Sequence, residues 1–458
     1  MFQGSLDSFT GFFADTELRR QCNRTRRIAL MNGDVVTNST GESSGINARV
    51  FRNGRCGFAS SPETDVGAAE RILKQASDNA AFLSAHLPPA GENLAPRTPV
   101  SHHGIWVEDR VAQKEILDFL LQIDDYIASR YPNLAARYVG CSCLSLEKEL
   151  KTNDGVYSYS FLPRSNVFIS LTAMTEEGTP VDRYEVFGGA GVYGANFSDP
   201  ALLYPRIDEV VAELMQKREG VFADAGRKTC ILAPELSGML AHEAVGHTAE
   251  ADFVISGSVA GPYRGKEVAS SLVTLTDFAN TYNGKSLPSP IYVDDEGVVA
   301  KDAVLIDHGI LTGWMHNRAS ADRYGDERTG NALAYGFADE PLIRMRNTAI
   351  LPGTDRFEDM VASIEDGYFF TATGNGQADA TGEFMFGITM GYEIKNGALG
   401  RALRDTTVSG VAFDVLKTVD MISDRMVWLN SGMCGKKQPF PVGLGGPHIK
   451  CKINVGGK

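Results

Sequence analysis

The sequence predicts an α+β protein, with an N-terminal antiparallel sheet and helices ahead of a β-rich, barrel- or sandwich-like C-terminal domain. The first 60 residues contain two predicted β-hairpins, because Asn32-Gly33 and Asn53-Gly54 each separate two strand-like runs. Long helical patterns then alternate with strands in the first half. Short strands and glycine-containing turns dominate the second half, which is typical of a closed or stacked sheet. We place the division between residues 1–222 and 223–458, in the stretch Gly220–Lys228.

The N-terminal part is expected to contain three helices and several strands. Apolar residues at helical spacing predict helices over 65–85, 112–130 and 207–217. The proline-containing stretch 87–100 is expected to be a linker or exposed loop. Residues 135–190 read as strands, with a turn at Asn153-Asp154-Gly155 and a clear strand over 167–174.

The C-terminal part is expected to be mostly short strands. Turns are predicted at Asp307-His308-Gly309 and at Asn396-Gly397, between runs of β-forming residues. Two helices are expected to interrupt the strands, near 357–365 and 410–421. A third helical segment, LAPELSGMLAHEAVGH, carries the candidate metal ligands discussed below.

Composition excludes several classes of protein. The 44 basic and 57 acidic residues give a net charge of −13, which disfavours binding to nucleic acid. The arginines between Arg19 and Arg27 are interpreted as a solvated face. The sequence has no apolar run of the roughly 18 residues that a membrane helix needs. The start, MFQGSLDSFTGFF, does not resemble a secretory signal, and seven scattered cysteines suggest a reducing setting, so we expect a cytoplasmic protein.

Residues 242–247 read His-Glu-Ala-Val-Gly-His and are the main candidate for chemistry. A metallopeptidase needs two neutral imidazoles on one metal ion and a carboxylate beside the bound water. The familiar spacing of the two histidines is four, whereas here it is five. On a regular α-helix five residues correspond to about 140° of rotation, so the rings would diverge. We therefore predict a π-bulge or a break at Gly246 that brings His242 and His247 together.

A third ligand is needed, and the spacing leaves several candidates open. Glu250, His308, His316 and Cys434 all lie downstream of the histidine pair. His308 falls in a predicted turn, where solvent exposure is its ordinary fate. Cys434 lies in a glycine-flanked loop, where the backbone allows a thiolate to approach a metal closely.

A group of separate motifs resembles the TldD branch of the TldD/PmbA metallopeptidase family. These are HEAVGHTAEADFV, VDDEG, RTGNA, RMRNT, TGNGQAD and SGMCGK, which occur in this order from about residue 225 to the end. INARVFRNGRCGFASS gives weaker similarity in the first half. The resemblance implies a β-rich two-domain subunit with a zinc ion (Zn2+) held by His242, His247 and Cys434. It implies that Glu243 is the catalytic base.

The resemblance also implies a function and partners. It implies a zinc metallopeptidase that hydrolyses unfolded peptides or removes leaders from peptide precursors. We expect a dimer, either with a PmbA/TldE-like subunit or with a second copy of the chain. An edge strand could hold an extended peptide, and TATGNGQAD is the candidate segment. The substrate-binding residues themselves are not identifiable from the sequence.

Two departures from the family pattern and two alternative functions accompany this prediction. The run after the cysteine, CGKKQPFPVG, is about one residue shorter than is typical, which affects the expected loop shape. Compared with the family pattern, we expect an abbreviated N-terminus, which affects the role expected for residues 1–25.

The alternatives are a non-catalytic peptide-holding subunit, which would need a defective metal site, and a subunit that modulates DNA gyrase.

Overall fold

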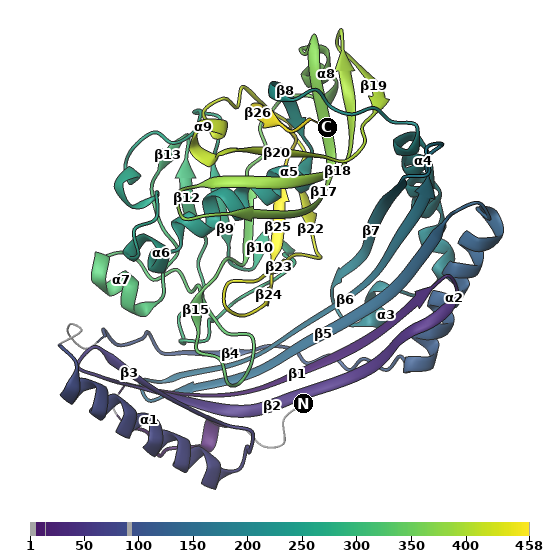
Figure 1. Cartoon of the computed structure of the whole chain (residues 1–458). Helices are drawn as coiled ribbons and strands as arrows, with labels where there is room; N and C mark the ends of the chain where they lie inside the picture. Colours follow the sequence, from purple (N-terminus) through teal and green to yellow (C-terminus); the bar gives the residue numbers. More distant parts are fainter. Residues whose placement is uncertain (1–5, 14, 89–93, 458) are drawn as a thin grey trace.

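The computed structural model describes residues 6–13, 15–88 and 94–457, and it confirms the α+β fold class (Figure 1). A single 3-10 turn, Leu6–Ser8, precedes the first strand. The helices and strands of the N-terminal part follow in this order: β1 Thr16–Met31, β2 Asp34–Arg52, β3 Arg55–Ser61, α1 Val66–His86, β4 Val100–His103, α2 Gln113–Arg130, β5 Ala136–Thr152, β6 Val156–Met174, β7 Pro180–Ala190, α3 Tyr193–Asn196 and α4 Tyr204–Arg218.

Long strands build the N-terminal sheet, in the order β3-β2-β1-β5-β6 with β4 and β7 on the outer edge of β6. All pairs are antiparallel except β4 with β6. The predicted turns form as expected, because Asn32, Gly33, Asn53 and Gly54 all take the positive φ that such tight turns require. The candidate linker lies partly outside the described residues, and its later part, 94–99, has no regular secondary structure before β4.

The two faces of this curved sheet have different roles. The helices cover one face: α1 packs on one end through a core that includes Leu18 and Ile46, and α2 and α4 pack on the other end over Ile28 and Val139. The opposite, concave face holds the C-terminal part of the chain (Figure 1). Strand residues alternate between the faces, so neighbouring positions serve different cores.

The C-terminal part contains a β-barrel, as the sequence predicted. The barrel strands lie side by side in the spatial order β17-β8-β26-β20-β18. The pairing of β17 with β18 closes the ring. A second sheet, ordered β13-β12-β9-β16-β25-β22, packs beside it. The main elements are β8 Gly226–Leu232, α5 Pro234–Met239, α6 Ala251–Ile255, β9 Leu275–Phe278, β12 Ala303–Asp307, β13 Ile310–Leu311, α7 Arg318–Tyr324, β16 Asn347–Ile350, α8 Phe357–Ala362, β17 Asp366–Ala378, β18 Glu383–Lys395, β19 Ala398–Ala402, β20 Thr406–Val411, α9 Ala412–Leu416, β22 Val427–Leu429, β23 Met433–Cys434, β24 Phe440–Pro441, β25 Gly443–Gly446 and β26 Ile449–Val455.

Buried charges join the N-terminal sheet to the C-terminal part. Glu17 of β1 binds Arg49 and Arg318, and Arg49 also binds Glu296 at 2.8 Å. The interpretation of the N-terminal arginines as a solvated face is wrong for Arg19, which is 1% exposed and lies 3.3 Å from Asp295. It is also wrong for Arg20, which is buried against Glu149. Residues of a strand alternate between faces, so Arg19 and Arg20 are each buried against a carboxylate, whereas Arg27 of the same strand is exposed.

Some predicted bounds differ from the structure. The helix expected near 410–421 is only the short α9, because 406–411 extend β20 instead. The helix expected over 357–365 ends at Ala362. The division at residues 222 and 223 stays a prediction, although it falls between the end of α4 and the start of β8.

Within the described ranges, we find no helix that is both long and apolar enough to cross a membrane.

Candidate metal centre

The His-Glu-Ala-Val-Gly-His segment lies on a helix that changes its winding. Helix α5 runs into a π-helix over Leu240–Gly246, and a 3-10 turn over His247–Ala249 follows. The backbone N–H of His247 donates to the carbonyl oxygen of His242, which is the i→i+5 bond of a π-helix. The wider winding turns both rings to one side, with ring centroids 5.2 Å apart. The prediction of a π-bulge is therefore confirmed.

Gly246 permits this winding for a different reason from the one expected. Its backbone is right-handed helical, so the conformational freedom of glycine is not used. A Cβ at this position would instead lie 2.0 Å from the sulfur of Met345, which is buried. The helix passes so close to Met345 that a side chain at position 246 would require either Met345 or the helix to shift.

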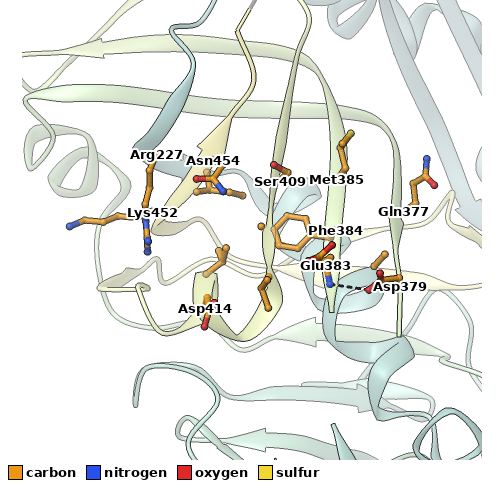
Figure 2. A pocket seen from close by; sticks show the side chains of 15 residues that line it. Arg227, Gln377, Asp379, Glu383, Phe384, Met385, Ser409, Asp414, Lys452 and Asn454 are labelled. Carbon is orange, nitrogen blue, oxygen red and sulfur yellow. Dashed lines mark hydrogen bonds between the residues drawn. The ribbon is translucent and has the colours of Figure 1, made fainter. Parts of the chain in front are cut away.

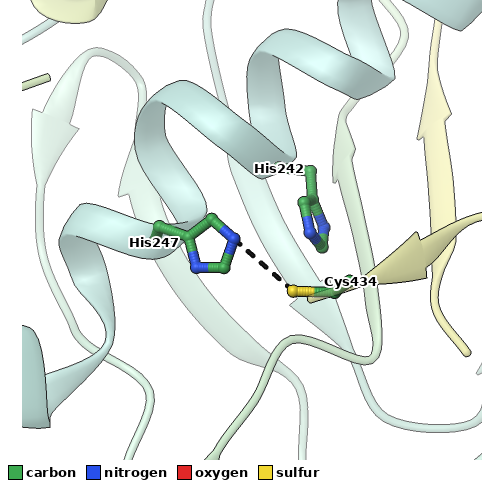
Figure 3. Close-up of side chains that lie close together, drawn as sticks. All are labelled: His242, His247 and Cys434. Carbon is green, nitrogen blue, oxygen red and sulfur yellow. Dashed lines mark hydrogen bonds between the residues drawn. The ribbon is translucent and has the colours of Figure 1, made fainter. Parts of the chain in front are cut away.

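Cys434 joins the two histidines from a distant part of the chain (Figure 3). Ligand atoms of His242, His247 and Cys434 all lie within 4.8 Å of one another. The His247 Nε2 to Cys434 Sγ distance is 3.5 Å. A tetrahedral zinc ion with its usual Zn–N and Zn–S bond lengths would place these two atoms about 3.5–3.6 Å apart. The donor set and its spacing therefore fit a zinc site with one position left open.

The electrostatics of the cluster favour a thiolate. Burial raises the pKa of Cys434, but hydrogen bonds and positive charge from His242 and His247 outweigh it and lower that pKa to about 3. Burial lowers the pKa of His247, but the charge of Glu250 and the bond to Cys434 raise it to about 10. Since metal ligands must be deprotonated, a metal ion that binds here would release the proton of His247.

Glu243 lies beside the cluster without belonging to it. Its Oε2 is 3.8 Å from His247 Nε2, and its side chain is 22% exposed. His242 is buried, so Glu243 is the more accessible of these two neighbours on the π-helix. The Glu243 carboxylate therefore lies close to the His247 ring nitrogen that faces Cys434.

The other sequence candidates for the third ligand lie outside the cluster. His308 is an exposed turn residue with its Nδ1 2.7 Å from Asp307. His316 is buried, but its ring nitrogens face Ser320 at 3.0 Å and Asp326 at 3.2 Å. Glu250 lies behind His247, with its Oε2 3.0 Å from His247 Nδ1, the ring nitrogen that does not face Cys434.

Sequence reasoning missed two cations that hold the loop of Cys434. Fully buried Arg344 donates to the carbonyl oxygens of Cys434 at 2.7 Å and of Lys436 at 3.1 Å. Lys436 in turn contacts Glu250 at 3.2 Å. Arg344 belongs to RMRNT and Lys436 to SGMCGK, so both motifs were visible, but nothing in their spacing indicated that they meet. The loop after Cys434 is a tight connection from β23 to β24, with Lys437 at positive φ.

Comparisons with known proteins identify the family of this chain. The PmbA/TldA metallopeptidase C-terminal domain matches residues 225–457, and domain 1 of the same family matches residues 16–80. The chain belongs to the PmbA/TldD metallopeptidase family. The first of these matches contains the π-helix and the Cys434 loop, so the candidate site lies within the C-terminal domain of the family.

Two of three curated relatives match nearly the whole chain, and the third matches about half of it. A metalloprotease of Methanothermobacter thermautotrophicus is 29% identical and covers 96% of this chain and 95% of its own. A metalloprotease TldD homolog of Haemophilus influenzae is 28% identical, over 96% of this chain and 92% of its own. A zinc metalloprotease TldD homolog of Saccharolobus solfataricus is 36% identical, over 55% of this chain and 57% of its own.

Solved structures of this fold are similar along the whole chain. TldE from Thermococcus kodakarensis superimposes with a TM-score of 0.77 at 16% identity, over 97% of both chains. A Thermotoga maritima protein, assigned provisionally as a modulator of a DNA gyrase, gives 0.73 at 18% identity over 96% of both. At these identities the likeness establishes the fold alone.

The PmbA/TldD barrel also bears a groove away from the metal ligands (Figure 2). It has a volume of about 690 Å³ and lies between β18, β20 and β26. Its lining includes the basic Arg227 and Lys452 and the acidic Asp379, Glu383 and Asp414. None of the histidines or cysteines of the metal cluster lines it, so the groove is separate from the candidate centre.

Proposed function

We propose that this chain is a zinc-dependent metallopeptidase that hydrolyses unfolded peptides or the leader segments of peptide precursors. The observation that carries the proposal is the geometry of His242, His247 and Cys434. Their spacing fits a tetrahedral zinc ion, and the Glu243 carboxylate lies 3.8 Å from His247 Nε2. The relatives named as metalloproteases support the same class of reaction.

Each residue has a distinct task in this proposal. A bound zinc ion would polarise the scissile carbonyl and make water a better nucleophile. Glu243 accepts the proton of the attacking water and then gives it to the departing amine, which is the task of a general base that also acts as acid. The π-helix directs the rings of His242 and His247 to the same side, where both could bind the metal ion. Cys434 contributes negative charge, so the site is a weaker Lewis acid than one with three histidines.

A strand edge next to the metal-site helix is the proposed place for the peptide. Strand β17 pairs with β8 only over Gly367–Phe370, and its next part continues with β18 alone. There the Thr373 N–H donates to Glu235 of α5 at 2.9 Å, and a Cβ on Gly376 would lie 3.4 Å from the sulfur of Met239. The glycine-rich segment predicted to hold substrate therefore borders the metal-site helix, and an extended peptide could add to its edge.

Of the two alternatives, a non-catalytic subunit would need a defective metal site, and His242, His247 and Cys434 are all present and close together. The gyrase-modulator description belongs to a structural neighbour at 18% identity, which carries no functional argument here.

The decisive experiment separates metal binding from catalysis. We expect about one zinc per wild-type chain by elemental analysis, and His242→Ala or Cys434→Ala should lose it. Glu243→Gln should keep the zinc but cleave a fluorogenic unfolded peptide about 10²–10⁴-fold more slowly. Wild-type cleavage by Glu243→Gln would refute its role as base. A zinc-loaded wild type that cleaves no unfolded peptide would refute the peptidase assignment.

A further inference from the structure

The side of His247 away from Cys434 holds a buried chain of charges. Glu250 is completely buried, and its Oε2 lies 3.0 Å from His247 Nδ1. A carboxylate only accepts hydrogen bonds, so the proton of the neutral imidazole must sit on Nδ1. The Nε2 lone pair is then directed toward Cys434 and the open space of the cluster. Such a carboxylate behind a ligating histidine fixes both the tautomer and the orientation of the ring.

The same carboxylate is bound to the loop of the third ligand. Lys436, two residues after Cys434, places its Nζ 3.2 Å from Glu250 Oε2. That ammonium also binds Asp252 at 2.7 Å and the carbonyl oxygen of Ile343 at 2.9 Å, and its side chain is 6% exposed. A buried carboxylate without a cation would be costly, so Lys436 compensates the charge of Glu250 while it fixes the loop.

We propose that Glu250 and Lys436 form a bridge that positions His247 and Cys434, two ligands 187 residues apart, in the geometry that binds the metal. Glu250 is then a positioning residue and not a ligand. Lys436 lies in the Cys434 loop and contacts Glu250, which contacts His247 at the end of the π-helix. These contacts fix the position of the loop relative to the π-helix. This inference rests on the proposed zinc site.

The structure offers a matched control for this bridge. Asp252 shares Lys436 with Glu250, and it is also a carboxylate on the same short segment. Among the described residues, no hydrogen bond or ion pair joins Asp252 to His247. If the bridge itself positions the ligands, removal of the Glu250 charge should weaken zinc binding more than removal of the Asp252 charge. If only the total charge around Lys436 matters, the two changes should have similar effects.

The test measures zinc affinity by competition with a chromophoric chelator, for the wild type, Glu250→Gln, Lys436→Met, the double variant and Asp252→Asn. Glu250→Gln should weaken zinc binding about 10–100-fold, the range typical for partners of metal-ligating histidines. Lys436→Met should weaken it in the same direction. The double variant should lose less than the product of the two single effects, because both remove one bridge. Asp252→Asn should change the affinity less than about threefold, below that range.

Two further readouts separate positioning from a mere loss of folding. Thermal unfolding of the metal-free proteins should show that each variant is folded. Replacement of zinc by Co²⁺ should show altered visible absorption bands in Glu250→Gln and unchanged bands in Asp252→Asn, since these bands report ligand geometry. Should Glu250→Gln fail to fold, Lys436→Met tests the bridge from its other end.

The outcomes distinguish this inference from the proposed function. Unchanged zinc affinity and Co²⁺ spectra in folded Glu250→Gln, or in folded Lys436→Met, would overturn the bridge even if the wild type cleaves peptides. An equal loss in Asp252→Asn would overturn it as well. A wild type that binds zinc but cleaves no peptide would instead refute the peptidase assignment and leave the bridge intact.

Discussion

At the scale of single residues, the site depends on close packing as much as on the ligands themselves. The five-residue spacing of His242 and His247 gave a correct prediction of the π-helix, because regular helical geometry would have separated the rings. The role of Gly246 could not be predicted in the same way. Its neighbour Met345 is 99 residues away, and sequence spacing carries no information about such a contact.

A methyl group at position 246 tests this packing. Gly246→Ala places a Cβ where the sulfur of Met345 now lies, so either the π-helix or Met345 must move. We expect a loss of about 1–3 kcal/mol in the free energy of unfolding, as for other overpacked cores, together with weaker zinc binding. Chemical denaturation and chelator competition measure the two effects.

Gly435→Ala is the matched control for this change. Gly435 follows the ligand Cys434, and a Cβ there would meet no heavy atom within 4 Å. Its variant should be close to the wild type in stability and zinc affinity. An equally mild result for Gly246→Ala would mean that the space beside Met345 is not what selects glycine.

At the scale of helices and strands, the sequence predicted what local geometry controls. The hairpin turns at 32–33, 53–54 and 396–397 and the long helices α1 and α2 rest on residue conformation and regular apolar spacing, and all of them form. Short elements such as α9 and β20 were mistaken because strand pairing with β18 and β26 decides where one ends and the other begins.

The part of β17 that pairs with β18 alone leads to a prediction about substrate backbones. An extended peptide that pairs with this edge presents only every second amide to it, because successive residues of a strand face opposite ways. The test uses two versions of one cleavable peptide. Each is N-methylated at every second amide, one at the odd and one at the even positions, with the scissile bond and its neighbours unmodified. The cleavage rate of one version should fall strongly and that of the other should stay near that of the unmodified peptide, as measured by liquid chromatography of the products.

The unmodified peptide and a version with matched side-chain methylation serve as controls for size. Equal cleavage of the two N-methylated frames would show that the peptide is not held by strand pairing.

At the scale of the whole molecule, buried ion pairs join the two parts of the chain at the concave face of the N-terminal sheet. Glu17 contacts Arg49 at 2.9 Å, Arg318 at 3.3 Å and also Arg97. Charge composition could not predict this network, because −13 is a sum that does not say which charges meet. Only the fold brings β2 to the loop of Glu296 and β1 to α7.

Removal of one carboxylate from this network should lower the stability of the folded chain. Glu17→Gln leaves buried arginines with too little negative charge, and we expect a loss of about 3–5 kcal/mol in unfolding free energy. Glu42→Gln is the control, since Glu42 is 56% exposed in its pair with Arg24 and should contribute less than about 1 kcal/mol. Urea denaturation measures both, and an equal effect of the two changes would show that burial does not matter here.

The arrangement of the molecule also limits what the proposed enzyme can accept. Cys434 packs in one apolar cluster with Leu146 of the N-terminal sheet, so the site lies between the sheet and the C-terminal part. A substrate that reaches it by strand pairing must be extended, and a folded domain can present such a segment only after local unfolding, which costs up to its global stability. The expected dimer, with a PmbA/TldE-like subunit or with a second copy, would narrow the access further.

We therefore predict cleavage of unfolded chains with loose sequence preference and resistance of compact domains. The measurement uses one small stable domain and the same domain with a core Leu→Ala change, which destabilises it by about 2–5 kcal/mol. The sequences are nearly identical, so a difference in rate reports unfolding and not recognition of side chains. If the substrate must open fully, the destabilised domain should be cleaved about 30-fold faster or more, because each 1.4 kcal/mol corresponds to a factor of ten in the unfolded population. Equal rates would mean that the site accepts folded surfaces, and the requirement for an extended chain would then be wrong.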